Sequence, residues 1–154
     1  MSLQRASDLP IARSSEKART QFAALCYRIN KDKPQVLLLT SRTTKRWITP
    51  KGWPIKGCSP AEAAAQEAYE EAGVQGRVRG QCLGIYSYDK VLDNRSRVPV
   101  VVAVFPLKVK RLLADYPEVK ERRRKWYSLK KAAARVDEPE LRSIILSFDP
   151  ARVR

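Results

Sequence analysis

Histidine is absent from this chain of 154 residues. Its absence excludes catalytic triads built on histidine and zinc sites with imidazole ligands, because each of these sites needs at least one imidazole. Any general base in this protein must therefore be a carboxylate or a metal-bound water molecule.

Long hydrophobic runs are also missing. The longest one, residues 98–107, is broken by two prolines and is far shorter than the roughly 20 residues that cross a membrane. The first residues include no apolar signal region. Three cysteines, Cys26, Cys58 and Cys82, are an odd number without metal-ligand spacing, which indicates reduced thiols. We therefore expect a cytoplasmic protein that makes no contact with a membrane.

Acidic residues are scarce, with 16 Asp and Glu against 31 Lys and Arg, and the net charge is +15. Residues 50–75 reverse this balance: their four acids and two bases give −2, so the rest of the chain carries +17. An acidic focus within a basic shell suits a metal-assisted enzyme for a polyanion, because the field concentrates phosphates near the site. The same balance suits a nucleic-acid binder, and charge alone does not separate the two classes.

The acidic segment contains a predicted helix with clear ends. Ser59 is a suitable N-cap, Pro60 suits the first helical position, and Glu62 completes a capping box. Gly73 supplies the left-handed residue that commonly ends a helix. Alanines fill one face of this helix, and such small side chains let it lie close to a sheet.

Three glutamates share the adjacent face of the same helix. At 3.6 residues per turn, Glu67, Glu70 and Glu71 fall within an arc of about 100°. Carboxylates spaced in this way repel one another by roughly 0.2–0.5 kcal/mol per pair on an isolated helix. The cluster therefore disfavours the helix by itself, but it suits a hard divalent cation, which prefers oxygen ligands.

This arrangement resembles the signature of the Nudix hydrolase family. The signature reads Gly, five residues, Glu, seven residues, Arg-Glu, an apolar residue, any residue, Glu-Glu, any residue, Gly and an apolar residue. The positions that match it in register are Gly52, Glu67, Ala68, Glu70, Glu71, Gly73 and Val74. The resemblance covers roughly residues 20–148 and implies an α/β (α+β) fold, a Nudix-type α/β/α sandwich with a mixed β-sheet between helices.

Two positions depart from the signature: Cys58 stands where the family has its first Glu, and Gln66 stands where it has Arg. In the family these two residues commonly pair with each other and brace the loop against the helix. Loss of one partner strands a charge, at a cost of about 3–5 kcal/mol in a dry site. Loss of both leaves two neutral groups, so we expect a diverged signature that still works.

The remaining pattern predicts a flexible basic arm over residues 1–18 and a single Nudix hydrolase domain over residues 19–150. Strands are expected at residues 21–29, 36–41, 46–49, 77–88, 98–109 and 125–129. The run 98–109 is nearly all β-branched or apolar, which is typical of a strand buried on both faces. Two more helices are expected at residues 130–136 and from about 138 to 147.

The resemblance implies that the chemistry is hydrolysis of phosphoanhydride (pyrophosphate) bonds with Mg²⁺ or Mn²⁺ as cofactor. Glu67, Glu70 and Glu71 are the expected catalytic and metal-binding residues, and a backbone carbonyl near Gly52 joins the metal site. We favour Glu70 and Glu71 as ligands and Glu67 as ligand or base. Three glutamates elsewhere are weaker candidates, because each is more simply explained as surface charge: Glu118, Glu121 and Glu138.

The expected phosphate clamp is a set of cations before and within the signature. Its members are Arg42, Lys45, Arg46, Lys51 and Lys56. Residues 41–50, 83–86 and 125–127 are similar to the diphosphoinositol polyphosphate phosphohydrolase branch of the family, which cleaves diphosphoinositol polyphosphates and diadenosine polyphosphates. The expected partner is therefore a polyanionic small molecule, and Trp47 or Trp53 is a candidate for stacking on a base.

Two alternatives stay open at this point. The high positive charge also favours removal of pyrophosphate from RNA 5′ ends, and the dense basic run at residues 120–125 is either a solvated face or a contact for RNA or a polyphosphate tail. Cys58 and Gln66 also allow a weakened Nudix domain that binds nucleotides or polyanions without turnover. The intact set of three glutamates argues against that second alternative.

Overall fold

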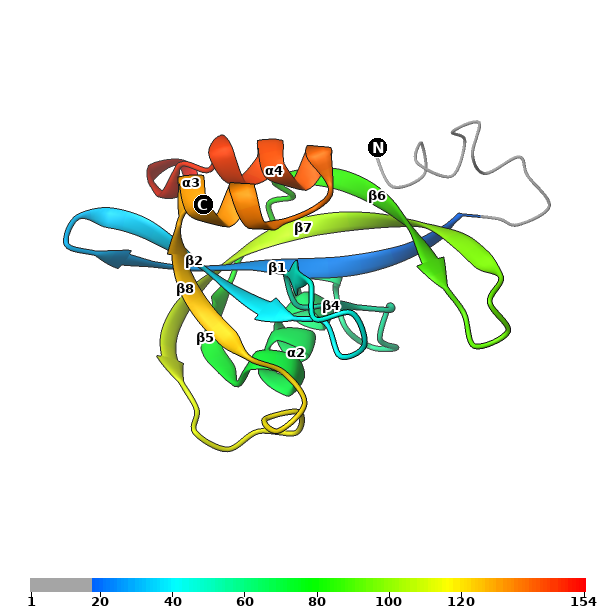
Figure 1. The fold of residues 1–154 in the computed structure, drawn as a ribbon. Coiled ribbons are helices and arrows are strands. Elements are labelled where there is room, and N and C mark those ends of the chain that lie inside the picture. Colours follow the sequence, from blue (N-terminus) through cyan, green and yellow to red (C-terminus); the bar gives the residue numbers. More distant parts are fainter. Residues whose placement is uncertain (1–17) are drawn as a thin grey trace.

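A mixed β-sheet of eight strands lies at the centre of the computed structural model, which describes residues 18–154. The helix α2 (Pro60–Ala72) covers one face of the sheet, and α3 (Leu129–Arg135) and α4 (Pro139–Leu146) cover the other (Figure 1). This arrangement confirms the expected α/β/α sandwich. The arm expected over residues 1–18 lies, except for its last residue, outside the described residues.

The strands follow the chain order with α2 inserted after the fourth. They are β1 (Arg19–Asn30), β2 (Lys33–Thr40), β3 (Trp47–Ile48), β4 (Lys51–Gly52), β5 (Val74–Val78), β6 (Gly84–Val91), β7 (Arg97–Leu112) and β8 (Arg124–Ser128). A short 3₁₀ helix, Pro150–Arg152, follows α4. No helix in the described part of the chain is both long enough and apolar enough to cross a membrane.

The two longest strands, β1 and β7, pair in parallel from Arg19–Val100 to Tyr27–Lys108. The other strand pairings are antiparallel, which makes the sheet mixed. On the side away from β1, β7 pairs with β6 along its first half and with β5 along its second half. On the other side of the sheet, β2 pairs with β1, β3 and β8.

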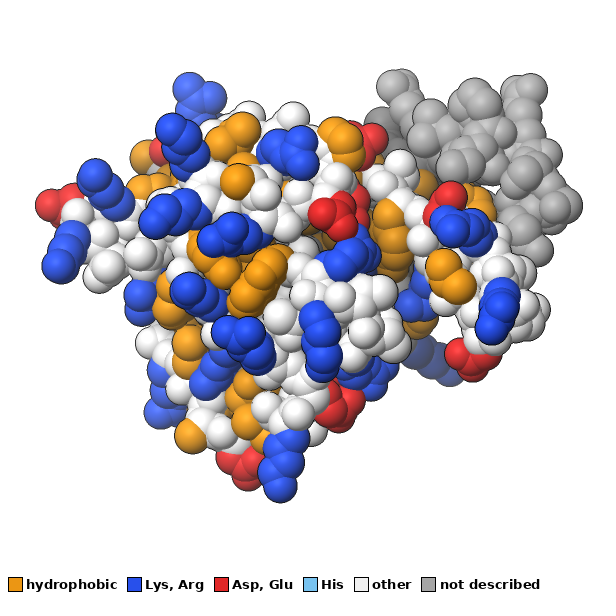
Figure 2. Space-filling view, viewed as in Figure 1, with side chains coloured by type: hydrophobic (Ala, Val, Ile, Leu, Met, Phe, Trp, Pro, Cys, Tyr) orange, Lys and Arg blue, Asp and Glu red, His pale blue; other side chains and the backbone are white. Residues whose placement is uncertain are grey.

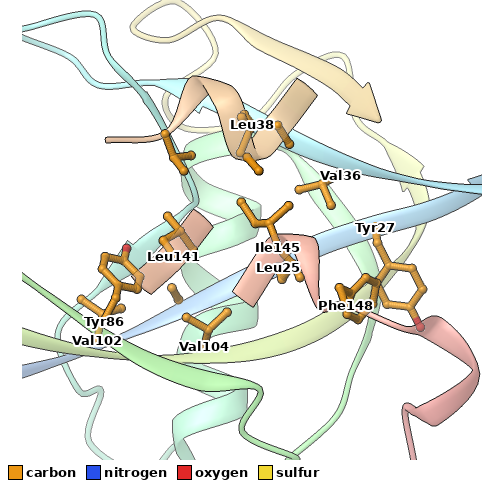
Figure 3. Packing of buried hydrophobic residues seen from close by; sticks show 14 of the residues in the cluster. Leu25, Tyr27, Val36, Leu38, Tyr86, Val102, Val104, Leu141, Ile145 and Phe148 are labelled. Atoms are coloured by element: carbon orange, nitrogen blue, oxygen red, sulfur yellow. The ribbon is translucent and has the colours of Figure 1, made fainter. Parts of the chain in front are cut away.

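The core lies on both faces of this central pair. Residues 98–107 of β7 are all buried, as the sequence predicted. Because successive side chains of a strand point to opposite faces, Val102 and Val104 face α3 and α4 whereas Phe105 faces α2. Figure 3 shows Val102 and Val104 close to Leu141 and Ile145 of α4.

The α2 helix begins and ends where the sequence predicted. The Ser59 side chain accepts a hydrogen bond from the Glu62 N–H, and the Glu62 side chain accepts one from the Ser59 N–H. Gly73 ends the helix in the left-handed conformation with φ of 66°. The alanine face is buried next to β1 and β5, so the glutamate face is left for the site.

The single strand predicted over residues 77–88 is wrong. The structure has two strands there, β5 and β6, because they pair with different halves of β7. The ladder is interrupted opposite Pro106, which has no N–H to donate: β5 ends at Val78, opposite Leu107, and β6 begins at Gly84, opposite Val104. The short strand predicted over residues 46–49 is present as β3, Trp47–Ile48, and β4 follows it at Lys51–Gly52.

Candidate active site

Gly52 and Glu67 are in direct contact at the edge where β4 meets α2. Pairing of Gly52 with Phe22 of β1 fixes the short strand β4 in place. A Cβ atom at Gly52 would lie only 2.6 Å from both carboxylate oxygens of Glu67. Glycine is therefore required for the backbone to approach this carboxylate so closely.

Glu71, one turn further along α2, forms a pair with Glu67. Its side chain is buried, with 6% exposure, and Glu67 is half-buried. Burial raises the pKa of Glu71 to about 8 and also raises the pKa of Glu67. The two carboxyl groups influence each other, and the proximity of Glu67 adds to the raised pKa of Glu71. The Lys51 N–H lies 3.4 Å from Glu71 Oε1.

This pair fits a divalent cation. Two carboxyl groups this close together in a largely buried position have desolvated oxygens and an unmet need for positive charge. A hard cation that prefers carboxylate and carbonyl oxygens would meet that need in place of the proton of Glu71. The Gly52 backbone, which lies against Glu67, adds a carbonyl to the same region.

The third glutamate of the motif is held differently. Glu70 Oε2 accepts a hydrogen bond of 2.8 Å from the Gln66 amide. Within residues 18–154, no group of three or more Cys, Asp and Glu side chains is already gathered around one metal position. The structure thus brings Glu67, Glu71 and Gly52 together and ties Glu70 to Gln66.

The two diverged positions are exposed. Cys58 lies in the loop before α2, where its N–H bonds to the Ile55 carbonyl at 3.0 Å, and Gln66 lies on the helix surface. Both side chains are neutral, so their replacement of Glu and Arg leaves no uncompensated charge at these positions.

Three of the five clamp cations have acidic or aromatic neighbours. Arg42 forms an exposed ion pair of 3.1 Å with Glu121, and this hydrogen bond raises the pKa of Arg42. Arg46 Nη1 lies 2.9 Å from Asp137 and 3.4 Å from Glu138.

Lys51 is half-buried. Its ammonium group lies 5.2 Å from the centre of the Tyr88 ring. Burial lowers its pKa to about 8, and the carboxylates of Glu71 and Glu138 oppose that shift. Lys45 and Lys56 are exposed. The five cations therefore differ in exposure and in the groups that neighbour them.

The three weaker carboxylate candidates are all in ion pairs. Glu121 pairs with Arg42, and Glu138 pairs with Arg46. Glu118 Oε1 accepts a hydrogen bond of 2.8 Å from Arg122 Nε. Of the two tryptophans considered for stacking, Trp47 packs edge-to-face on Tyr127 at 5.4 Å, whereas Trp53 is 37% exposed.

Sequence reasoning missed two arginines in the basic run 120–125. Arg122 and Arg124 are half-buried and lie on the α2 side of the sheet, together with Trp126. Arg123 and Lys125 are exposed on the other side. Side chains of a strand alternate between its two faces, so counting back from Trp126 would have separated the half-buried arginines from the exposed cations.

Comparison with known proteins places this site in a family. The sequence model of the NUDIX domain matches residues 19–148. Human diphosphoinositol polyphosphate phosphohydrolase 3-beta is 34% identical over 119 residues, which cover 76% of this chain and 68% of that protein. The alpha form of the same enzyme from mouse is 33% identical over the same coverage.

Solved structures share the fold. A Nudix hydrolase from Nitrosomonas europaea superimposes with a TM-score of 0.66 at 20% identity, covering 89% of this chain and 92% of that one. The Ap4A hydrolase from C. elegans gives a TM-score of 0.59 at 21% identity, covering 84% and 94% of the two chains.

Proposed function

Because this chain belongs to the Nudix family and hydrolyses pyrophosphate bonds, we propose that its substrates are polyphosphorylated small molecules such as diadenosine or diphosphoinositol polyphosphates. The relative at 34% identity is named for its action on diphosphoinositol polyphosphates, and a structural neighbour is an Ap4A hydrolase. The net charge of +15 suits substrates that are densely negative.

Mg²⁺ or Mn²⁺ is the proposed cofactor. Glu67, Glu70 and Glu71 would hold it together with the Gly52 carbonyl, since these groups offer only oxygen. A bound divalent ion supplies charge neutralisation on the bridging phosphates and lowers the pKa of a water nucleophile. The single observation that carries this proposal is the buried Glu67–Glu71 pair packed against Gly52.

In this proposal, basic residues of the expected clamp orient the substrate relative to Glu67 and Glu71. Arg42 and Arg46 exchange their acidic partners for phosphate oxygens, and Lys51 adds charge from below the surface, with Lys45 and Lys56 further out. Many Lys and Arg side chains line the face that includes β8 and α3, and few acidic ones interrupt them (Figure 2). A long-range positive field of this kind speeds the arrival of polyanions.

The test is phosphate release from a panel of substrates with Mg²⁺, with Mn²⁺ and with a chelator. The panel contains diadenosine polyphosphates, a diphosphoinositol polyphosphate, nucleoside triphosphates, ADP-ribose and RNA with a 5′-triphosphate. We expect cleavage that requires the metal and is fastest on one of the first two substrates. Cleavage that persists in chelator, or no cleavage at all by folded protein, would contradict the proposal.

A variant separates the site from the rest of the surface. We expect E70Q to lose activity by about 100-fold or more while the fold is kept, because a glutamine cannot supply the anionic ligand. E140Q, which changes an exposed glutamate at the start of α4, is the matched control and should keep full activity. Retained metal-dependent turnover in E70Q would remove Glu70 from the site.

RNA 5′ ends are the second proposed substrate class. A preference of the enzyme for RNA would appear as tight RNA binding whose affinity falls steeply as the salt concentration rises.

For the cellular location we propose the cytoplasm. The three cysteines Cys26, Cys58 and Cys82 are free and two of them are exposed, as is usual in a reducing compartment.

A further inference from the structure

Exposed cations gather on β8 and α3, away from the candidate active site. Residues 120–135 contain eight Lys and Arg and one Glu, a balance of +7. Arg122 and Arg124 are half-buried on the α2 side of the sheet. The other basic side chains of the segment are exposed: Lys120, Arg123, Lys125, Lys130, Lys131 and Arg135.

Three of these exposed cations lie against two aromatic rings that touch each other. Lys125 Nζ lies 5.4 Å and Arg135 Cζ lies 5.3 Å from the centre of the Tyr127 ring. Arg123 Cζ lies 5.9 Å from the centre of the Trp47 ring, and the two rings pack edge-to-face at 5.4 Å. Because aromatic faces attract cations, the rings keep the three charges together. We call these five residues the β8–α3 surface.

The acids of the chain leave this positive charge unbalanced. Within residues 18–154, no Asp or Glu forms an ion pair with Arg123, Lys125 or Arg135, since each ion pair there uses another cation. Lys125 and Arg135 also converge on one ring, and like charges at short range repel each other. Such a cluster favours the binding of an anion from outside the chain.

The shape of the β8–α3 surface suits a chain of phosphates. Arg123 and Lys125 are two residues apart on one face of β8, so their backbone positions lie about 7 Å apart along the strand. Arg135 continues the set from α3. In the described part of the chain β8 pairs only with β2, so these cations lie at an edge of the sheet. A row of cations of this kind can follow a repeating phosphodiester backbone.

The apolar content of the surface favours nucleic acid over a membrane. The exposed large apolar side chains in residues 18–154 all lie outside β8 and α3, whereas peripheral membrane binding commonly uses inserted apolar side chains. Figure 2 shows Lys and Arg side chains around a small hydrophobic area over β8. The half-buried Trp47 leaves part of its ring exposed there, which suits stacking of an unpaired base.

We propose that the β8–α3 surface binds the phosphodiester backbone of a single-stranded nucleic acid, with Arg123, Lys125 and Arg135 as the phosphate contacts. This binding uses neither the glutamates of α2 nor the cations of the clamp, so it is a separate property of the molecule. It gives a role to the exposed members of the basic run 120–125.

The test is the fluorescence anisotropy of a labelled RNA of about 20 nucleotides with a 5′-hydroxyl group, measured in chelator. This probe has no pyrophosphate bond, so its binding does not depend on hydrolysis. Single-stranded DNA of the same sequence shows whether the 2′-hydroxyl contributes. We expect the wild type to bind both probes, with a slope of log affinity against log salt of about −2 for three phosphate contacts.

K125Q R135Q removes the two cations over Tyr127. We expect it to weaken RNA binding by about 10–30-fold near 0.1 M salt and to make the slope shallower by about 1.4, because each contact to a single strand contributes about 0.7. K108Q K110Q is the matched control, since it removes two exposed lysines from β7, which β1 and β2 separate from β8. This control and K125R R135K, which keeps both charges, should bind within about threefold of the wild type.

Several results would overturn the proposal. Absence of RNA and DNA binding at about 50 mM salt would remove the partner, and equal losses in K125Q R135Q and K108Q K110Q would show an effect of net charge alone. Vesicles containing phosphatidylserine and inorganic polyphosphate are measured in parallel. Tighter binding to either one, lost in K125Q R135Q, would assign the surface to a different anion. If thermal unfolding shows that this variant does not fold, R123Q K125Q replaces it with the same expectation.

The outcome is independent of the proposed hydrolysis. RNA binding that K125Q R135Q loses supports the β8–α3 surface even if the wild type cleaves nothing in the substrate panel. Metal-dependent cleavage without binding of the 5′-hydroxyl RNA would support the proposed function alone.

Discussion

At the scale of single residues, Gly52 decides how closely the loop can approach α2. A side chain there would collide with the Glu67 carboxylate, since a Cβ would lie 2.6 Å from its oxygens. The backbone of Gly52 does not need a positive φ, so the requirement is one of space and not of conformation. Any larger residue must displace Glu67 from its present position.

We therefore expect G52A to lower kcat by about 10–100-fold, because displacement of a reacting group by about 1 Å has costs of this order. Gly80→Ala is the matched control: a Cβ there meets no atom within 4 Å and its φ is not positive. Steady-state kinetics and thermal unfolding of both variants check the prediction. Equal activity of G52A and G80A would show that Glu67 is not needed where it lies.

The residues of the acidic face could be predicted because their signal is local. Ser59, Glu62 and Gly73 mark the ends of the helix within one segment, and the period of 3.6 residues places the glutamates on one face. Sequence did not reveal that Glu70 is bound to Gln66 while Glu71 is buried. That difference depends on which side of the helix the β4 loop covers.

At the scale of elements, β8 stabilises the end of α2. The α2 helix has no basic residue in its last turn. Arg124 supplies the missing charge from β8, because its Nη1 donates to the Ala72 carbonyl at 2.6 Å and its Nη2 to the Leu113 carbonyl at 2.7 Å. Its guanidinium also lies 4.8 Å from the centre of the Tyr116 ring. A cation at a helix C-terminus interacts favourably with the helix dipole.

We expect R124Q to lower the free energy of unfolding by about 2–3 kcal/mol, because two partly buried carbonyls lose a charged donor. For a domain of this size that corresponds to a fall in Tm of roughly 4–12 °C. R123Q removes an exposed charge from the adjacent position and should stay within about 0.5 kcal/mol of the wild type. Urea denaturation followed by circular dichroism measures both, and an equal loss in the two variants would refute the capping role of Arg124.

Elements with their own local signals were predicted well, and elements that depend on a partner were not. The buried run of β7 was recognisable from its composition alone. The division between β5 and β6 was not, because it arises from Pro106 in the strand that both of them pair with. The basic run 120–125 was misread for the same reason, since the burial of Arg122 and Arg124 depends on α2 lying across from β8.

At the scale of the whole molecule, the absence of histidine simplifies the response to pH. Between about pH 5 and 8, histidine is ordinarily the side chain that titrates, and this chain has none. Raised carboxyl pKa values therefore dominate this range, and burial raises that of Glu71 to about 8. Lys51, whose pKa burial lowers to about 8, is charged in the folded and unfolded states below that pH and adds little slope there.

The sign of the effect follows from proton binding. Below its unfolded pKa of about 4.3, Glu71 is protonated in both states; between that value and about 8 only the folded protein holds the proton. Stability is therefore greatest at the acidic end of this window and is lost as the pH rises through the folded pKa of Glu71. We expect the metal-free protein to lose on the order of 2 kcal/mol between pH 5.5 and 8.

Thermal unfolding in chelator at these two pH values measures this loss, and each kcal/mol lowers the Tm by about 2–4 °C. E71Q is the control, because its neutral side chain resembles protonated Glu71 and should remove most of the slope. Saturating Mg²⁺ should also flatten the profile, since a cation that replaces the proton of Glu71 stabilises the ionised carboxylates at pH 8. A Tm that rises with pH in chelator, or a slope that E71Q keeps, would show that the Glu67–Glu71 pair does not hold a proton in the folded protein.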